Sequence, residues 1–148
     1  MTRTLTAALA LALGATALAG CESILDQDRG PLSGTSWKLA TMVTMGNRTT
    51  LAPAASDRHR ITFNRDGSLQ LQLDCNNGRS SWSQQETGPM EGTLTIGDIA
   101  STRAFCPPPS FGQDMANDLP TARSYRIVPA TDRLRIETRR TEYVFDRL

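Results

Sequence analysis

Short segments in which apolar and polar residues alternate dominate the chain beyond its N-terminal part. The clearest is residues 69–73, which read Leu-Gln-Leu-Gln-Leu. Alternation with a period of two places every second side chain on the same face of a β-strand, so this segment predicts a strand with one buried face. Residues 35–43, which include Trp37, and residues 61–63 show the same pattern. Several such segments in a row are typical of an antiparallel sheet.

Turn-forming residues separate these segments. Arg65-Asp66-Gly67 predicts a hairpin turn, because glycine readily adopts the positive φ that such turns need. Asn76-Asn77-Gly78 predicts a second turn, and residues 45–58 show no periodicity, so we expect a loop there. Further strands are expected at residues 79–84, 93–96, 124–128, 134–138 and 142–145.

One helix is expected after the rigid run of prolines at residues 107–109. Ser110 offers an N-cap, and Gln113 lies three positions later, in the spacing of a capping box. The apolar residues that recur every four positions are Phe111, Met115 and Leu119. They form one stripe, which we interpret as core because such a stripe is more often core than a cofactor pocket. Pro120 should end or kink the helix.

The N-terminal residues have the features of a bacterial lipoprotein signal. Arg3 provides a positive charge, and residues 5–17 form an apolar run that is too short to cross a bilayer. The sequence Leu18-Ala19-Gly20-Cys21 follows and matches a lipobox, in which small residues precede a cysteine. We therefore expect cleavage between Gly20 and Cys21 and acylation of Cys21. The alternative is a plain secretory signal whose cysteine is incidental.

This signal divides the chain into three parts. Residues 1–20 are the expected signal peptide, residues 21–33 the lipidated cysteine and a polar tether, and residues 34–148 the folded domain. The protein would then face an oxidising compartment and be held at a membrane by the acyl chains on Cys21. Glu22 is not the aspartate that commonly retains lipoproteins at the inner membrane, so we expect the periplasmic face of the outer membrane.

Charge and cysteine content narrow the possibilities further. Removing residues 1–20 leaves 128 residues, enough for one domain, with 15 basic and 15 acidic side chains. A balanced charge argues against nucleic-acid binding. We also expect a monomer. Besides Cys21, the chain has Cys75 and Cys106, an even pair that would close a loop of about 32 residues as a disulfide. A reactive thiol pair or a metal site is the alternative, although C-x-x-C spacing is lacking.

The sequence offers no catalytic constellation, and we expect no enzyme, cofactor or metal. His59 is the single histidine, and its flanking arginines favour a surface or edge-strand position over a catalytic one. Asp66 and Asp74 could pair as acid and base, but Asp66 is better explained by the hairpin turn. The Asn76 amide could bond backbone groups and fix its turn. Arg103 could face a partner or an anionic ligand, although a solvated arginine is the simpler interpretation.

Three segments together resemble a known family. They are Gly34-Thr35-Ser36-Trp37-Lys38-Leu39, Asp74-Cys75-Asn76-Asn77-Gly78 and Ala100-Ser101-Thr102-Arg103-Ala104-Phe105-Cys106. In this order they resemble the META domain, the family of the heat-shock protein HslJ. The resemblance implies an α+β fold, with a strongly curved antiparallel sheet, a partial barrel, around one main helix. It draws attention to Gly34, Trp37, Asn76, Gly78 and Thr102, together with the two cysteines, as determinants of the fold.

Two functions are compatible with these observations. The first is a non-enzymatic lipoprotein of the bacterial envelope that binds a protein partner or an apolar ligand. Because members of the family are linked to envelope stress, and because the fold is similar to that of pilotin lipoproteins, a role in stress tolerance or as a chaperone-like module is implied. The second is a thiol–disulfide redox protein, or a minor hydrolase, that uses Cys75 and Cys106.

Overall fold

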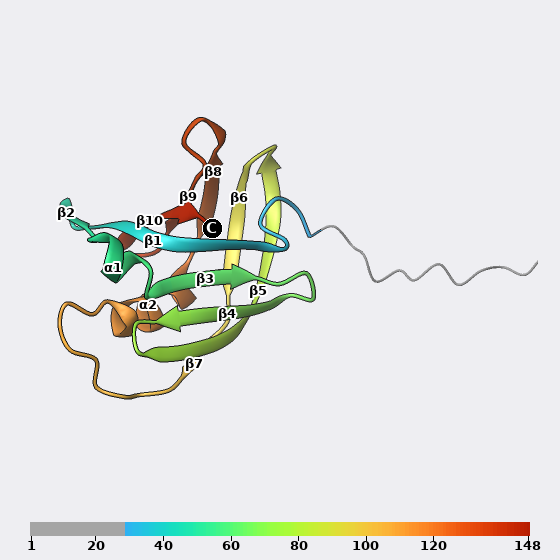
Figure 1. The fold of residues 1–148 in the computed structure, drawn as a ribbon. Coiled ribbons are helices and arrows are strands. Elements are labelled where there is room, and N and C mark those ends of the chain that lie inside the picture. Colours follow the sequence, from blue (N-terminus) through green and yellow to red (C-terminus); the bar gives the residue numbers. More distant parts are fainter. Residues whose placement is uncertain (1–28) are drawn as a thin grey trace, which may run out of the picture.

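The structure, a computed structural model, describes residues 29–148. These residues form ten β-strands and two short α-helices (Figure 1). The strands are β1 (Thr35–Thr44), β2 (Asn47–Thr50), β3 (His59–Phe63), β4 (Ser68–Leu73), β5 (Asn76–Gly88), β6 (Glu91–Ile96), β7 (Ala100–Ser101), β8 (Ser124–Val128), β9 (Arg133–Glu137) and β10 (Thr141–Arg147). The helices are α1 (Pro53–Ser56) and α2 (Gly112–Asp118), and the 3-10 turns are η1 (Leu119–Thr121) and η2 (Pro129–Thr131). No helix within these residues is long and apolar enough to cross a membrane.

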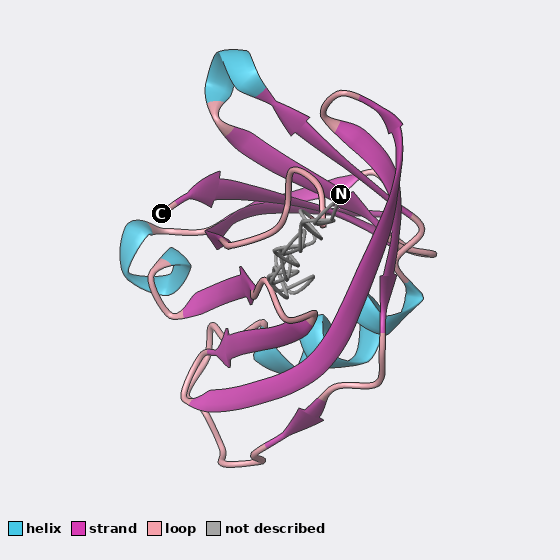
Figure 2. Cartoon of the chain, turned by 90° about the vertical axis from the view of Figure 1, so that its right-hand side faces the viewer, coloured by secondary structure: helices cyan, strands magenta, loops and turns pink. Residues whose placement is uncertain are grey.

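Strand β1 closes the sheet into a barrel because it pairs on both of its edges. Residues 37–44 pair antiparallel with β10, and residues 35–38 pair with β3 on the other side. The other strands follow in the order β3-β4-β5-β6-β8-β9-β10, so eight strands form the wall of the barrel (Figure 2). The expected antiparallel, strongly curved sheet is confirmed. The expected partial barrel is corrected to a closed one, since β10 returns to β1.

Large apolar side chains fill the inside of the barrel. The largest fully buried ones include Trp37, Phe63, Tyr125, Tyr143 and Phe145. They come from alternating strand positions, and the predicted strand at residues 69–73 follows the same rule, with its three leucines inward. Burial of a side chain of this size stabilises the fold by about 1.5–3 kcal/mol. The alternating pattern in the sequence therefore identifies the residues that contribute most to the stability of the barrel.

Two predicted irregular segments contain regular structure instead. Residues 45–58, expected as a loop, contain β2 and α1. The turn expected at residues 76–78 lies earlier: Asp74 has a φ of 65°, and β5 begins at Asn76. In both places the chain forms a hairpin with the strand that precedes it, β1 and β4. Pairing with the preceding strand overrides the turn preference of asparagine and glycine at residues 76–78.

Helix α2 is shorter than predicted and begins without a side-chain cap. Ser110 precedes the helix but does not cap it; the N-cap position is Phe111, whose backbone N–H is bound elsewhere. As predicted, the regular helix ends before Pro120, and the chain continues as η1. Gly112 lies so close to β4 that a Cβ there would be 2.3 Å from the carbonyl oxygen of Leu73. Close backbone packing against the barrel therefore positions this helix.

The folded part begins before the predicted boundary at Gly34. Leu32 is fully buried, the Ser33 N–H donates to the carbonyl of Gly30, and the Gly34 N–H donates to the carbonyl of Phe63. The last residues assigned to the tether therefore belong to the barrel. Cys21 and the Gly20–Cys21 cleavage site lie outside the described residues.

Candidate functional site

The predicted disulfide between Cys75 and Cys106 is present. Its sulfur atoms are bonded, with the Cα atoms 5.7 Å apart. The bond joins the tight turn after β4 to the irregular segment of residues 102–111, which leads into α2. We call this segment the pinned loop. The disulfide therefore attaches a surface loop to the barrel wall.

Asn76 holds the same loop through its side-chain amide. Its Oδ1 accepts hydrogen bonds from the Ala104 N–H at 2.7 Å and from the Thr102 hydroxyl at 2.8 Å. Its Nδ2 donates to the Ala104 carbonyl at 2.9 Å. The hydroxyl of Thr102 also accepts from the Asn77 N–H at 3.1 Å. The amide was expected to fix its own turn, whereas it fixes a segment 26–28 residues away.

His59 is fully buried, which corrects the expected surface position. Its Nδ1 lies 2.7 Å from the Ala55 carbonyl oxygen, and its Nε2 lies 3.0 Å from the Phe111 backbone nitrogen. Because a carbonyl can only accept and an N–H can only donate, the ring carries its proton on Nδ1 and is neutral. It joins α1 to the end of the pinned loop. Both ring nitrogens are occupied by the backbone, so His59 has a structural role.

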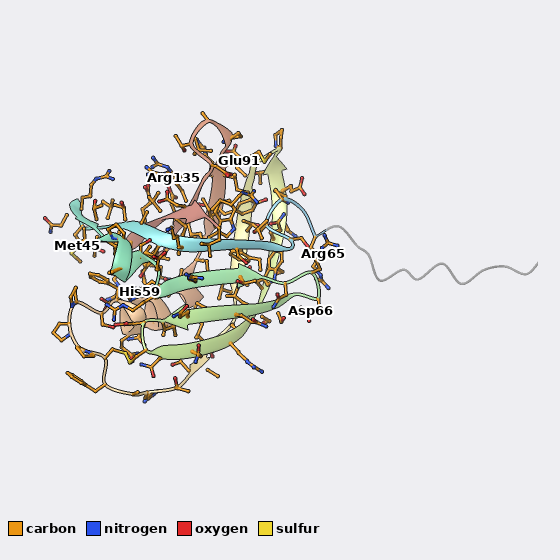
Figure 3. All side chains as sticks on the ribbon, viewed as in Figure 1. Met45, His59, Arg65, Asp66, Glu91 and Arg135 are labelled. Carbon is orange, nitrogen blue, oxygen red and sulfur yellow. A yellow bond between two sulfur atoms is a disulfide. The ribbon has the colours of Figure 1, made fainter. Side chains whose placement is uncertain are left out.

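Asp66 and Asp74 do not form a pair, because they lie at opposite ends of β4. In Figure 3, Asp66 lies with Arg65 at one end of β3 and His59 at the other. Hydrogen bonds from the hydroxyl and the backbone N–H of Ser68 lower the pKa of Asp66, as is typical of a turn aspartate. The Asp74 side chain is buried, and Arg58 Nη1 lies 2.6 Å from its Oδ1. The contact is an ion pair, and no hydrogen bond to the Asp74 carboxylate is found within residues 29–148.

The other residues of the family motifs shape the barrel. Gly34 has a φ of 72°, which favours glycine. Trp37 is fully buried, and its indole N–H donates to the Thr35 hydroxyl at 2.7 Å. A Cβ at Gly78 would be 2.9 Å from side-chain atoms of Leu73 and Ile99. These residues contribute to the packing and the turn geometry of the barrel.

One open groove lies on the outside of the barrel beside β8. Its volume is about 540 Å³, and charged side chains line it. Arg126 pairs with Glu91 and Arg135 with Glu142, both at 2.8 Å. Figure 3 shows Glu91 and Arg135 on this upper side of the molecule. Because its charges are already paired across the groove, this surface offers few free groups to a ligand.

Two positions of the pinned loop are open to solvent. Phe105 exposes 87% of its surface, the largest fraction among the exposed large apolar residues of the described chain. Arg103 is also exposed and has no ion pair within residues 29–148. The exposure of Phe105 could have been predicted from the sequence. It stands beside Cys106 and the prolines at residues 107–109, and a run of prolines cannot continue a strand of the sheet.

The geometry defines a class of protein: a small, closed, antiparallel β-barrel with a disulfide-bound surface loop. The profile of the META domain matches residues 30–147, so the chain belongs to the META domain family. A search of curated proteins finds no match.

Two solved structures are similar in fold. One is the NMR structure of a protein from Burkholderia xenovorans, with 18% identity and a TM-score of 0.58 over 79% of this chain and 83% of that one. The other is the crystal structure of a DUF4847 family protein from Bacteroides vulgatus, with 14% identity and a TM-score of 0.51 over 76% of this chain and 92% of that one. At these identities the likeness concerns the fold alone.

Proposed function

We propose that this protein is a lipid-anchored component of the bacterial envelope that is not an enzyme and acts through contacts of its outer surface. The anchor is Cys21, exposed by cleavage after Gly20, and the location is the periplasmic face of the outer membrane. Participation in tolerance to envelope stress, by binding or chaperoning a partner, is the finer proposal that the family resemblance supports.

The observation that carries this proposal is that His59, Asn76 and Asp74 serve the architecture of the barrel. His59 binds two backbone groups, Asn76 binds the pinned loop, and Asp74 is buried beside Arg58. A nucleophile, a base and an orienting acid would have to lie within hydrogen-bond reach of one another. The arrangement of these residues instead supports a scaffold.

The filled barrel favours a protein partner over an enclosed apolar ligand. Fully buried aromatic rings from β1, β3, β8 and β10 occupy the interior where a lipid-binding barrel would hold its ligand. The hollows beside the barrel are open, and polar and apolar atoms both line them. Binding through the outer surface is therefore the better supported mode.

Metabolic labelling with radioactive palmitate tests the anchor. We expect label in the wild-type protein and a mature N-terminus at Cys21 by mass spectrometry, and no label in Cys21→Ala. Glu22→Gln is the matched control and should keep the label. An unlabelled wild-type protein that retains residues 1–20 would refute the anchor.

Extraction of the purified mature protein tests the mode of binding. We expect no fatty acid or phospholipid beyond the acyl chains attached to Cys21. A stoichiometric amount of non-covalent lipid would show that the barrel holds an apolar ligand, contrary to the proposal.

A redox function is the second candidate, because Cys75 lies at the surface, where a thiolate could reach the bond. Trapping of free thiols in native protein incubated with a glutathione buffer distinguishes the two functions. Rapid exchange would favour redox chemistry, whereas an inert bond would favour the structural role.

A further inference from the structure

One face of the barrel gathers basic side chains along its whole length. Lys38 on β1 lies opposite Arg60 on β3, and Arg79 lies on the same outer surface, on β5, because directly paired residues of neighbouring strands point to the same side. The exposed residues Arg29 and Arg65 lie at one end of this surface, and Arg103 lies at the other. We call these six residues together the basic face.

The basic face has few acidic partners. Lys38 and Arg60 share Asp57, at 3.1 and 4.0 Å. Asp66 lies beside Arg29, Glu86 lines a hollow together with Arg29, and Asp146 is paired with Lys38 across β1 and β10, where it also binds Arg133. Basic residues therefore outnumber the acidic residues around the face. The residues of the face without an ion pair among residues 29–148 are Arg29, Arg65, Arg79 and Arg103.

The part of the wall that includes β8, β9 and β10 is arranged differently. Four of its arginines are each 2.8 Å from a carboxylate, in the pairs Arg126–Glu91, Arg133–Asp146, Arg135–Glu142 and Arg147–Asp132. The four unpaired arginines of the basic face, together with Lys38 and Arg60, make that face attractive to an extended anionic surface.

Phe105 extends from the end of the basic face where Arg103 lies. The disulfide and the amide of Asn76 fix the backbone on both sides of it, so a contact with Phe105 would cost little ordering entropy. An exposed, rigidly held aromatic ring beside an arginine is suited to the boundary between lipid headgroups and acyl chains.

The anchor would keep this face near the membrane. The eight residue steps from Cys21 to Arg29 span at most about 28 Å, even when fully extended. Arg29 donates to the carbonyl of Arg65 beside the β3–β4 turn, whereas Cys75 and the pinned loop lie at the other end of β4. Figure 1 shows residues 29–34, in blue, and the pinned loop, in orange, at opposite ends of β3 and β4. These two strands therefore run from the end of the barrel where residue 29 lies to the end where the pinned loop lies.

We propose that the barrel lies on its side against an anionic phospholipid surface, with the basic face toward the headgroups and Phe105 inserted among them. This inference rests on the proposed lipid anchor, because the short tether holds the domain at the surface.

Vesicle binding by the mature chain, residues 21–148 with Cys21→Ser, tests the face without the acyl chains. We expect binding to phosphatidylglycerol vesicles at low salt, little binding to phosphatidylcholine vesicles, and release by salt. The double variant Arg79→Gln/Arg103→Gln should bind about 25-fold more weakly, since each basic residue near an anionic surface contributes about fivefold. The matched control is Arg123→Gln/Arg139→Gln, which removes the same charge from exposed positions elsewhere and should bind nearly as well as wild type.

A fluorescent probe tests the position of Phe105. Because Trp37 and Trp82 are buried, Phe105→Trp should add an emission that shifts to the blue on vesicle binding and is quenched by brominated lipid. Met90→Trp, in the turn between β5 and β6, should not respond.

Three results would overturn the inference: no binding of the mature chain to anionic vesicles at low salt, equal losses in the two double variants, or no response at position 105. Binding of the face to an acidic protein, but not to vesicles, would also overturn it. Because this chain lacks the acyl group, failure here leaves the palmitate experiment on Cys21 unaffected.

Discussion

Asn76 and Ala104 are joined by two hydrogen bonds that run in opposite directions. The Asn76 Nδ2 donates to the Ala104 carbonyl at 2.9 Å, and the Asn76 Oδ1 accepts from the Ala104 N–H at 2.7 Å. The side-chain amide thus pairs with the main chain as a neighbouring strand would. These bonds continue the pairing of β5 with β7 into the pinned loop, and the Cys75–Cys106 disulfide holds the same loop two residues further on.

Replacing Asn76 should destabilise the protein. Asn76→Ala removes both bonds to Ala104 and the acceptor for Thr102, and we expect a loss of about 1–3 kcal/mol in the free energy of unfolding. Denaturant titration measures this difference. Asn77→Ala is the matched control, because the structure gives its side chain no hydrogen bond within the described chain. Equal losses in the two variants would contradict the assigned role.

Removing the disulfide should cost more than removing the amide. The bond closes a loop with a sequence separation of 31, for which the chain-entropy model gives about 3.5–4 kcal/mol. We expect Cys75→Ser/Cys106→Ser to unfold at correspondingly lower denaturant, and added reductant to lower the stability of the wild type but not of the double variant. An unchanged midpoint in the double variant would show that the bond contributes nothing to stability.

His59→Ala should be strongly destabilising. The substitution leaves the Ala55 carbonyl and the Phe111 N–H without their partner in a fully buried site and creates a cavity. These effects together predict a loss of about 3–5 kcal/mol. Thermal or denaturant unfolding provides the measurement. His59→Gln, which keeps one donor and one acceptor, should lose less; a loss as large as that of the alanine variant would argue that ring packing alone matters.

Both tyrosines of the chain should resist ionisation in alkaline solution. Burial raises the pKa of Tyr125 to about 12, with the Glu86 carboxylate adding to the effect. Burial, followed by the charge of Asp118, raises the pKa of Tyr143 well above its ordinary range.

The sign of the pH dependence follows from these directions. A folded-state pKa above the unfolded value of 10 stabilises the fold fully below pH 10, and this contribution is lost as pH rises above 10. At about pH 11 the folded protein should show little tyrosinate absorbance, whereas the denatured chain should be about nine-tenths ionised. Reversible ionisation of either tyrosine near pH 10 in the folded protein would contradict its buried position.

The strands of the barrel could be predicted from the sequence because their information is local. Alternation at residues 69–73 specifies which side chains face inward, whatever the partner strand. The disulfide could be predicted by counting, since the resemblance of residues 18–21 to a lipobox sets Cys21 apart and leaves Cys75 and Cys106 as a pair. The segments at residues 34–39, 74–78 and 100–106 also indicate the fold through their resemblance to the family.

The role of His59 could not be predicted, because its partners lie on α1 and at the start of α2, and the latter is 52 residues away in sequence. The flanking arginines point outward and suggested an exposed residue. The sequence also misplaced the helix start: His59 accepts from the N–H of Phe111, and α2 begins at Gly112 without a side-chain cap.

The sequence by itself determined the antiparallel strands, the cysteine pair and the family. Local alternation predicts the strands, the number of cysteines predicts the pair, and short motifs indicate the family. Only the tertiary structure decided that β1 meets β10, that Leu32 belongs to the core, and that unpaired arginines share one side of the barrel with Phe105. These relations depend on how strands far apart in the chain close around a common core, and closure depends on the packing of all of them together.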